Sequence, residues 1–432
     1  MKDRILARAA SSRAGLAKSA FLPLTFVLAV LGAGICHAAP EFSGQVRAEY
    51  FDQRASSRGP VAEAASLSPG IVALPASGPE LETELRASGD GVSGIVTFDQ
   101  HDQHDRLRGD AYVNEVFWSG GGASWQFSAG KKIVGWDVGY GFRPNDVVAQ
   151  EARRTLLATT SEGRPVLMAE HFDASTAWSF VLVNPTKPRE QRGAEEPAIA
   201  MRFYLRDGAV DWHGFTRYGA HTGASVGGAA AWVASEAIEL HASVRYLDKA
   251  DTTAIDATSV ERSASGLVAV DPWRGASVRG ATQALAGGTW TNADQVSVLV
   301  EAWWDSTALS NAQWREWSGR NSQLALRVGS LAPGFAIAGN VAWQADAFNA
   351  STNLRRGNLF ARLSWTHDKW LSAIDMLYTP ADAGRVLTSA LGWQGDRVRL
   401  DGGLRSYGGP SAAVIAQTPT RRTMYVAGTW SF

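Results

Sequence analysis

The chain has 432 residues with 41 basic and 42 acidic side chains, which gives a formal charge of −1. This balance argues against general nucleic-acid binding, and the mean hydropathy of −0.13 is far below that of a helical membrane protein. Yet 17 tryptophans and 44 glycines are unusual for a soluble enzyme. A transmembrane β-barrel reconciles these values, because only alternate residues of its strands face lipid while aromatic residues gather at the two interfaces.

The first 39 residues have the three-part layout of a secretory signal peptide. Basic residues precede the apolar run AFLPLTFVLAVLGAGI, and the small-residue sequence CHAAP follows it. An uncleaved anchor and a lipoprotein fit less well, because Pro23 interrupts the run and Ile35 precedes Cys36. We expect removal of residues 1–39, which takes away a net charge of +4 and the only cysteine. The mature chain would then carry a charge of about −5 and form no disulfide.

Residues 40–432 read as a single barrel domain, in which segments of about ten residues alternate apolar and polar side chains. In the first segment, Phe42, Val46 and Tyr50 alternate with Arg47 and Glu49. An amphipathic helix would instead place apolar residues three and four apart. The same alternation recurs in later segments, at 199–206, 238–247, 296–305 and 398–405.

One segment, DAYVNEVFWS, does not allow its faces to be assigned. Either choice of face turns Asn114 or Glu115 outward. We therefore predict a strand there without stating which side chains face the interior.

The connections between these segments are of two kinds. Short ones contain the Gly, Asn or Asp that a turn requires, at 88–91, 119–124, 206–211, 291–294 and 394–397. Long ones are expected at about 54–79, 133–165, 249–280 and 306–321. Short turns at one end and long loops at the other are typical of bacterial barrels, which have even strand numbers. The sequence therefore predicts an all-β, antiparallel up-and-down transmembrane barrel of about 18 to 20 strands without a plug domain.

The chain ends in TMYVAGTWSF, with apolar residues at alternate positions and an aromatic residue last. In this respect the whole chain resembles a Gram-negative outer-membrane β-barrel of the porin or alginate-export type. The resemblance implies a location in the outer membrane and recognition by the barrel-assembly machinery through Tyr425, Trp430 and Phe432. Gly428 departs from the pattern, since a larger apolar residue is commoner at that position.

The polar faces of the strands would line the interior. Residues expected to line the pore are Arg202, Arg206, Arg245, Glu301, Arg362, Arg397, Arg399 and Asp401. These charges have two interpretations. They could pair across strands and hold the wall in register, or arginine could bind the carboxylates or phosphates of passing anionic solutes or of an acidic polysaccharide.

The stretch GKKIVGWDVGYGFRPNDVVAQEARR, residues 130–154, falls where porins fold a loop into the barrel to narrow the channel. The resemblance implies a constriction there, formed or supported by Lys131, Lys132, Trp136, Asp137, Tyr140, Phe142, Arg143 and Asp146, with Arg153 and Arg154. The alternative is a loop packed on the rim of the barrel.

Two other groups have simpler interpretations. His101, Asp102, His104 and Asp105 could hold a divalent ion, but a short, solvated loop tip is the interpretation we adopt, so no metal or cofactor is expected. The tryptophans are interpreted as interface girdles, namely Trp303, Trp304, Trp314, Trp317, Trp343, Trp365, Trp370, Trp393 and Trp430.

The sequence thus predicts an outer-membrane channel for passive passage of small or anionic hydrophilic solutes, or for export of an acidic polysaccharide. Its expected partners are outer-membrane lipid, the assembly machinery and the solute, not nucleic acid. A structural or adhesive barrel with ligand-binding loops is the alternative. A hydrolase is a weaker one, since His171, His213 and His241 could act as bases but no G-x-S-x-G motif appears.

Overall fold

The structure is a computed structural model that describes residues 40–102, 107–150, 161–263 and 266–432. Their strands form one antiparallel sheet of 18 members, within the predicted range. The strands are β1 (Glu41–Ala55), β2 (Gly78–Gly89), β3 (Val92–Asp102), β4 (Leu107–Gly121), β5 (Trp125–Lys132), β6 (Arg164–Phe172), β7 (Thr176–Val183), β8 (Ala198–Asp207), β9 (Val210–Gly219), β10 (Gly223–Ser235), β11 (Ile238–Ile255), β12 (Trp273–Thr291), β13 (Val296–Asp305), β14 (Gly357–His367), β15 (Trp370–Thr379), β16 (Gly384–Gln394), β17 (Val398–Gly408) and β18 (Thr420–Ser431).

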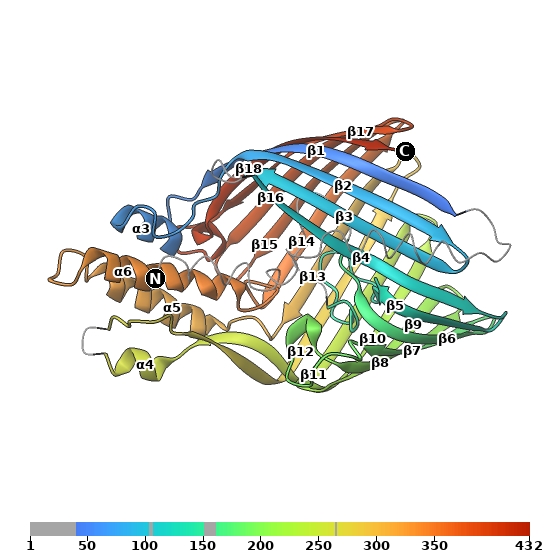
Figure 1. Ribbon diagram of the computed structural model, residues 1–432, viewed down its shortest axis with the longest axis horizontal. Coiled ribbons are helices and arrows are strands. Elements are labelled where there is room, and N and C mark those ends of the chain that lie inside the picture. Colours follow the sequence, from blue (N-terminus) through green and yellow to red (C-terminus); the bar gives the residue numbers. More distant parts are fainter. Residues whose placement is uncertain (1–39, 103–106, 151–160, 264–265) are drawn as a thin grey trace.

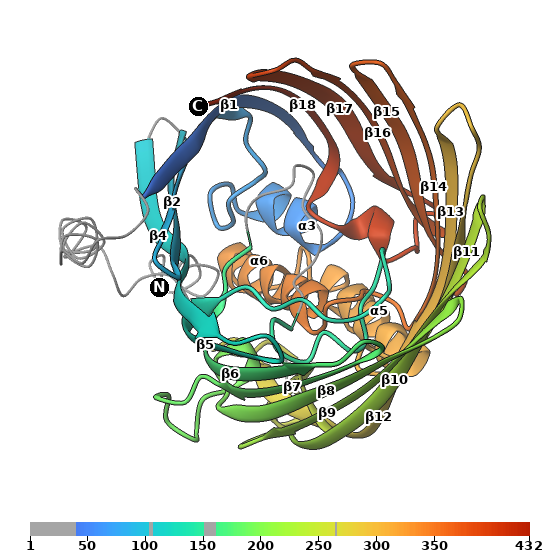
Figure 2. The same cartoon turned by 90° about the vertical axis from the view of Figure 1, so that its right-hand side faces the viewer.

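The sheet closes on itself, because β1 pairs with β2 on one side and with β18 on the other. Figures 1 and 2 show the resulting barrel from the side and along its axis. At the seam, the backbone N–H of Phe432 donates to the carbonyl of Gly44, and the N–H of Gly44 donates to the carbonyl of Phe432, both at 3.0 Å. Closure leaves no open sheet edge, which in lipid would expose unpaired backbone groups.

The predicted alternation of faces is confirmed. On β13, Val300 is 51% exposed on the outside while the neighbouring Glu301 is fully buried inside. On the last strand, Val426 and Trp430 are exposed outward while Tyr425 is buried inward. The outer surface of the barrel is therefore apolar and the charged side chains lie within it.

A β-bulge explains the strand whose faces could not be assigned. On β3, Ile95 pairs with Glu115 and Val96 pairs with Val113, so Asn114 is an extra residue in β4. The buried Asn114 side chain accepts a hydrogen bond from the Thr97 hydroxyl at 2.8 Å. The bulge breaks the strict alternation, so neither choice of face fits the whole strand.

The connections divide between the two ends of the barrel as expected. The five predicted short turns lie at the end where the chain terminates, and the long connections lie at the other end (Figure 1). Two long connections differ in extent from the prediction. The expected loop 249–280 is largely strand, because β11 continues to Ile255 and β12 begins at Trp273; the expected loop 306–321 extends through residue 356.

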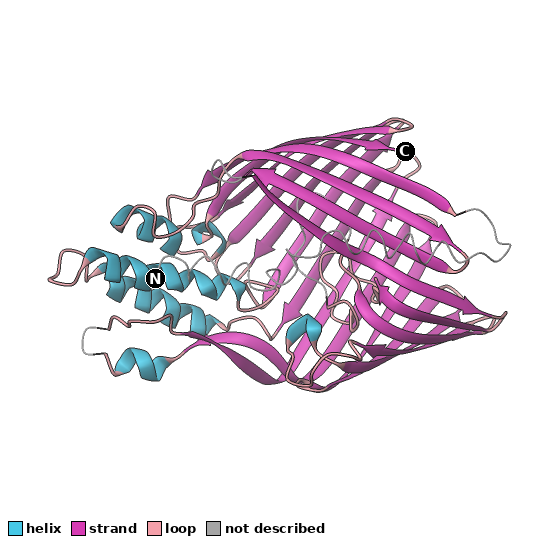
Figure 3. Cartoon of the chain, viewed as in Figure 1, coloured by secondary structure: helices cyan, strands magenta, loops and turns pink. Residues whose placement is uncertain are grey.

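Helices occupy the long connections, and the α-helices gather at one end of the molecule (Figure 3). They are α3 (Pro60–Leu67), α4 (Ala257–Glu261), α5 (Asn311–Ala325) and α6 (Gly334–Trp343), with 3-10 turns at η1 (Gly193–Glu195), η2 (Gln344–Asn349) and η3 (Ile415–Gln417). A shared apolar core from α3, α5 and α6 contains Ala64, Leu324, Ile337, Val341 and Ala342. None of the described helices is both long enough and apolar enough to cross a membrane.

The structure corrects the interpretation of four tryptophans as girdle residues. Trp314, Trp317 and Trp343 are buried in a core formed by the long connections, and Trp303 is buried on the inner face of β13. By contrast Trp304, Trp365, Trp370 and Trp430 are exposed on the outer face, as expected. The spacing of three between Trp314 and Trp317 is helical, and it brings their rings within 5.2 Å of each other.

Candidate functional site

Residues 133–150, called here the inner loop, leave β5 and enter the barrel. Figure 2 shows this teal segment running from β5 across the interior. Its side chains and backbone make hydrogen bonds with β9, β10, β11 and β13 on the inner wall. The loop therefore lies against the wall inside the barrel, not on its rim.

Asn145 is the first anchor of the inner loop. Its side-chain amide donates to the Ser243 hydroxyl at 2.8 Å and to the Val244 carbonyl at 3.0 Å. Asp137 accepts hydrogen bonds from the Asn145 backbone N–H and, at 2.9 Å, from the same Ser243 hydroxyl. The Asp137 backbone has a φ of 108°, which is uncommon outside glycine. Asp137 and Asn145, eight residues apart in the loop, are thus both held by Ser243 on β11.

Two buried arginines hold backbone carbonyls of the inner loop. Arg245 donates to the Pro144 carbonyl at 3.1 Å, and Arg217 donates to the Val147 carbonyl at 2.7 Å. Arg217 also pairs with the buried Glu196, at 3.2 Å, in the connection before β8. Although burial opposes ionisation, hydrogen bonds from Thr222 and from the peptide N–H of residue 221 lower the pKa of Glu196. A charged Glu196 compensates the buried guanidinium of Arg217.

Glu301 on β13 is the third anchor. Its carboxylate accepts hydrogen bonds from the backbone N–H groups of Tyr140, at 2.6 Å, and of Gly141. A side chain at position 141 has no room, because a Cβ atom there would lie 2.7 Å from the Glu301 carboxylate and 2.9 Å from the Trp303 ring. The carboxylate also lies 2.9 Å from Nε2 of His241.

Aromatic side chains add apolar contact at both ends of the loop. Trp136 packs 6.4 Å from Phe215 on β9, in a buried cluster that includes Val147 and Val148. Phe142 stacks 5.9 Å from Trp303 on β13. Burial of such rings stabilises the loop by about 1.5–3 kcal/mol per side chain.

The predicted constriction residues therefore divide into two groups. Trp136, Asp137 and Phe142 are largely buried and contact the wall, and Asp146 is buried as well. Tyr140 and Arg143 are half-buried, and the Tyr140 hydroxyl accepts a hydrogen bond from Arg362 at 2.6 Å. Lys131 and Lys132 belong to the end of β5 instead, where Lys131 contacts Glu162 and Lys132 donates to Ser128. Arg153 and Arg154 lie outside the described residues.

The predicted lining residues also occupy different places. Arg245 and Glu301 are buried beneath the inner loop, where they hold it. Arg362 pairs with Asp375 at 3.3 Å and Arg399 pairs with Asp401 at 2.8 Å, and both arginine side chains remain partly exposed. Arg202 is half-buried beside His213. Arg206 and Arg397 lie at the short-turn end, Arg397 within the turn itself.

An acidic wall stands on the inner face of β1 to β3. Register pairs Glu49 with Glu80 and Glu82 with Asp99, and Arg47 lies 2.9 Å from Glu82. The next strand, β18, turns uncharged residues inward around the buried Tyr425. Beyond it, β14 and β17 carry Arg362 and Arg399, each paired with an aspartate, so these two arginines lie apart from the acidic wall.

The residues missed from sequence were Asn145 and Ser243, which fix the loop to β11, and His241, which contacts the anchor Glu301. Polar residues are frequent in such a chain, and only these long-range contacts distinguish the three residues. His104 and Asp105 of the candidate metal cluster lie outside the described residues. Elsewhere in the described part, no group of three His, Cys, Asp or Glu residues is placed to hold a metal ion.

The three histidines considered as catalytic bases have other partners. The His171 ring lies 3.7 Å from Asp173, His213 lies 3.4 Å from Arg202, and His241 lies between two carboxylates. None of them hydrogen-bonds a serine within the described ranges. A serine–histidine pair of the kind used by hydrolases is therefore not found there.

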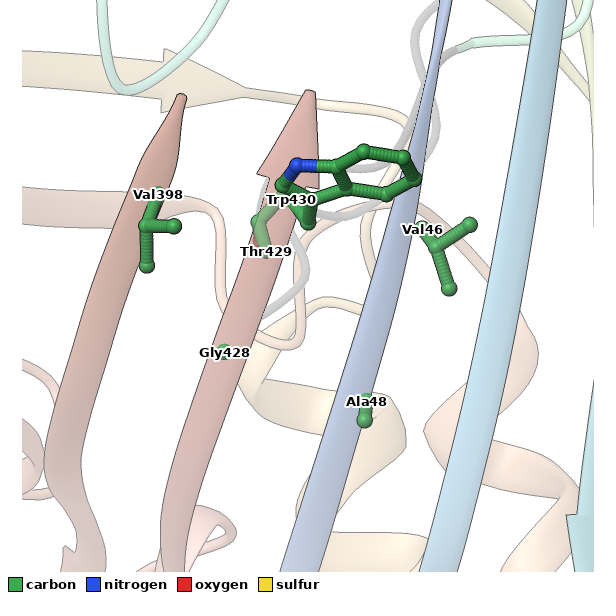
Figure 4. A pocket seen from close by; sticks show the side chains of 6 residues that line it. All are labelled: Val46, Ala48, Val398, Gly428, Thr429 and Trp430. Carbon is green, nitrogen blue, oxygen red and sulfur yellow. The ribbon is translucent and has the colours of Figure 1, made fainter. Parts of the chain in front are cut away.

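The residues predicted to form an assembly signal lie at the seam. Trp430 and Phe432 face outward with their rings 4.9 Å apart, whereas Tyr425 faces inward. Figure 4 shows an apolar hollow beside Trp430 on the outer surface, lined by Val46, Ala48, Val398, Gly428, Thr429 and Trp430. Gly428 and Ala48 leave this hollow because neither has a large side chain.

Neither a family model nor a curated protein matches the sequence. Among solved structures, the chain is similar to Pseudomonas aeruginosa OccK5 (OpdH), with a TM-score of 0.51 and 6% identity over 91% of this chain and 98% of that chain. It is also similar to P. aeruginosa OccK8 (OprE), with a TM-score of 0.49 and 7% identity over 91% and 98% of the two chains. Acinetobacter baumannii OccAB1 matches with a TM-score of 0.49 and 10% identity over 91% and 96%. The likeness to OccK5 supports a porin-like barrel as the fold of this chain.

Proposed function

We propose that the chain is a channel of the outer membrane through which small hydrophilic solutes pass passively. The observation that carries this proposal is the inner loop, which is anchored inside a closed barrel with an apolar outer face. A loop fixed within a barrel narrows the path without filling it, as a size- and charge-selective channel requires. The apolar band would contact lipid, and the final strand would be the part presented to the assembly machinery.

The charge of the solute is proposed from the partly exposed arginines. Arg362 and Arg399 retain partly exposed guanidinium groups on the inner wall, where they can meet carboxylates or phosphates. We therefore propose that small anionic solutes pass along the sector of β14 to β17. A polysaccharide would have to pass the packed helices α3, α5 and α6, so export of a polymer is not part of the proposal.

Reversing the charge of this sector should change ion selectivity. In the double variant Arg362→Glu with Arg399→Glu, the reversal potential in a salt gradient should shift toward cation preference, because rings of charge set selectivity in pores. The single variant Arg397→Glu reverses one arginine in the exposed turn between β16 and β17 and is the control, with a small expected shift. Equal reversal potentials for wild type and double variant would remove the arginines from the proposed path.

Reversing the charge on the inner loop itself tests its part in the path. Arg143 is half-buried and donates to the Gly139 carbonyl within the loop at 3.0 Å. We expect Arg143→Glu to shift the reversal potential in the same direction as the double variant, since the loop faces the same interior. A selectivity identical to wild type in a correctly assembled barrel would show that ions do not pass this loop.

A further inference from the structure

His241 lies between two carboxylates beneath the inner loop. Its Nε2 atom is 2.9 Å from Glu301, and its Nδ1 atom is 3.2 Å from both oxygens of Glu239. Both ring nitrogens can donate at once only when the imidazole carries two protons. The geometry is therefore that of an imidazolium bridging Glu239 and Glu301.

We infer that His241 is a positioning residue whose protonation sets how firmly the inner loop is held, so that ion flow depends on pH. This inference rests on the proposed channel function. His241 acts on the loop through Glu301, which holds the loop backbone at Tyr140 and Gly141. Loss of one proton from His241 leaves a single N–H group, which can serve Glu239 or Glu301 but not both.

The groups around the His241 ring determine what the loss of one proton does. The charged groups facing His241 are Glu239 on its own strand, β11, and Glu301 on β13. Its register neighbours on β10 and β12 are the uncharged Ala231 and Gly287. A Cβ atom at position 287 would lie 2.8 Å from Nε2 of the ring, so β12 offers space for no other side chain there. Of these described neighbours, only His241 places a positive group against Glu301.

Protons can reach the ring through Glu239. The side chains of His241 and Glu301 are 3% and 0% exposed, whereas that of Glu239 is 35% exposed. When the ring is neutral, Glu301 becomes a buried carboxylate without a cationic partner, which is unfavourable in a site of low polarity. The anchored position of the loop is then less stable, and the effect grows as pH rises through the titration of the ring.

The same contacts connect His241 to the interior. Glu301 fixes the backbone of Tyr140, and the Tyr140 hydroxyl accepts a hydrogen bond from Arg362. Arg362 in turn pairs with Asp375 on β15. Release of the loop would therefore both widen the interior and change the environment of an arginine on the proposed path.

A thiol on the loop tests the inference without relying on ion flow. The only cysteine is Cys36, so in a Cys36→Ser background the variant Arg143→Cys carries one thiol. Its rate of modification by a cationic methanethiosulfonate reagent is measured between about pH 6 and pH 9, with and without His241→Gln. Glutamine can donate to Glu301 at every pH, so this contact does not titrate in the variant. The thiol ionises equally in both backgrounds, so the ratio of the two rates removes the effect of its ionisation.

We divide the modification rate measured with His241 by the rate measured in the His241→Gln background. This ratio should rise roughly tenfold as pH increases, which corresponds to the loss of one charge-assisted hydrogen bond. His213→Gln is the matched control, since the contacts described for that histidine are with β8 and β9, and it should leave the rise intact. Single-channel conductance of wild type should rise over the same pH range, and that of His241→Gln should not.

A rate ratio that stays constant with pH would overturn the role of His241, even if the barrel conducts ions. A chain that conducts no ions at any pH would instead overturn the proposed channel function. The thiol measurement would still decide whether His241 controls the loop, so the two failures are distinguishable.

Discussion

Gly227→Val should release the inner loop and raise single-channel conductance several-fold. Gly227 lies on the inner face of β10, where a Cβ atom would be 1.9 Å from the Asn145 side-chain oxygen. Valine would therefore displace Asn145 and remove its hydrogen bonds to Ser243 and to the carbonyls of Val244 and Gly228. At about 1 kcal/mol for each hydrogen bond, the loop loses roughly 3 kcal/mol of anchoring free energy.

Gly228→Val is the matched control for this substitution. The two glycines are neighbours on β10 but face opposite sides of the sheet. A Cβ atom at position 228 would lie 3.4 Å from the carbonyl oxygen of His213, which is an ordinary contact distance. We expect a conductance close to wild type for Gly228→Val, and the prediction is wrong if Gly227→Val also conducts like wild type.

Deletion of Phe432 should reduce the yield of assembled barrel several-fold. Phe432 exchanges two backbone hydrogen bonds with Gly44 at the seam, and these would be lost together with the terminal ring. The loss amounts to roughly 2 kcal/mol at the point where β1 meets the end of the chain. The amount of heat-modifiable barrel in the outer-membrane fraction, measured by electrophoresis, gives the yield.

Phe432→Trp separates the two contributions of the terminal residue. The variant retains the backbone pairing with Gly44 and an exposed aromatic ring beside Trp430. Its yield should stay near that of wild type. A normal yield of heat-modifiable barrel after deletion of Phe432 would show that neither the seam pairing nor the terminal ring is needed for assembly.

The closed sheet could be predicted from sequence because each strand carries its own signal. Successive residues of a strand face opposite sides of the sheet. The polarity of residues such as Val300 and Glu301 therefore predicts which face each occupies, even when the neighbouring strands are unknown. The bulge at Asn114 was the exception. One extra residue shifts the alternation, and its position depends on the register with β3.

The roles of the charged residues could not be predicted in the same way. Arg245 and Arg399 both alternate with apolar residues, yet Arg245 is buried against the inner loop and Arg399 remains partly exposed. The difference comes from the loop, which covers the inner face of β9 to β13 and leaves β17 uncovered. The alternation of residues within one strand does not predict where a loop that is distant in sequence will pack.

The helices of the long connection carried a signal that the strand pattern obscured. Ser310 and Gln313 form a capping box at the start of α5, and Trp314 and Trp317 follow at helical spacing. Tryptophan is also typical of barrel interfaces. With a connection expected to end near residue 321, Trp314 and Trp317 could therefore be interpreted as girdle residues. Burial in the structure distinguishes the two interpretations.

The most direct measurement of the central claim is a single-channel recording of the purified, heat-modifiable barrel in a planar lipid bilayer. The structure predicts discrete current steps of uniform size, because one closed barrel with an anchored inner loop offers one defined path for ions. Insertion of folded barrel into the bilayer with no current steps would contradict the account and would favour a structural or adhesive barrel.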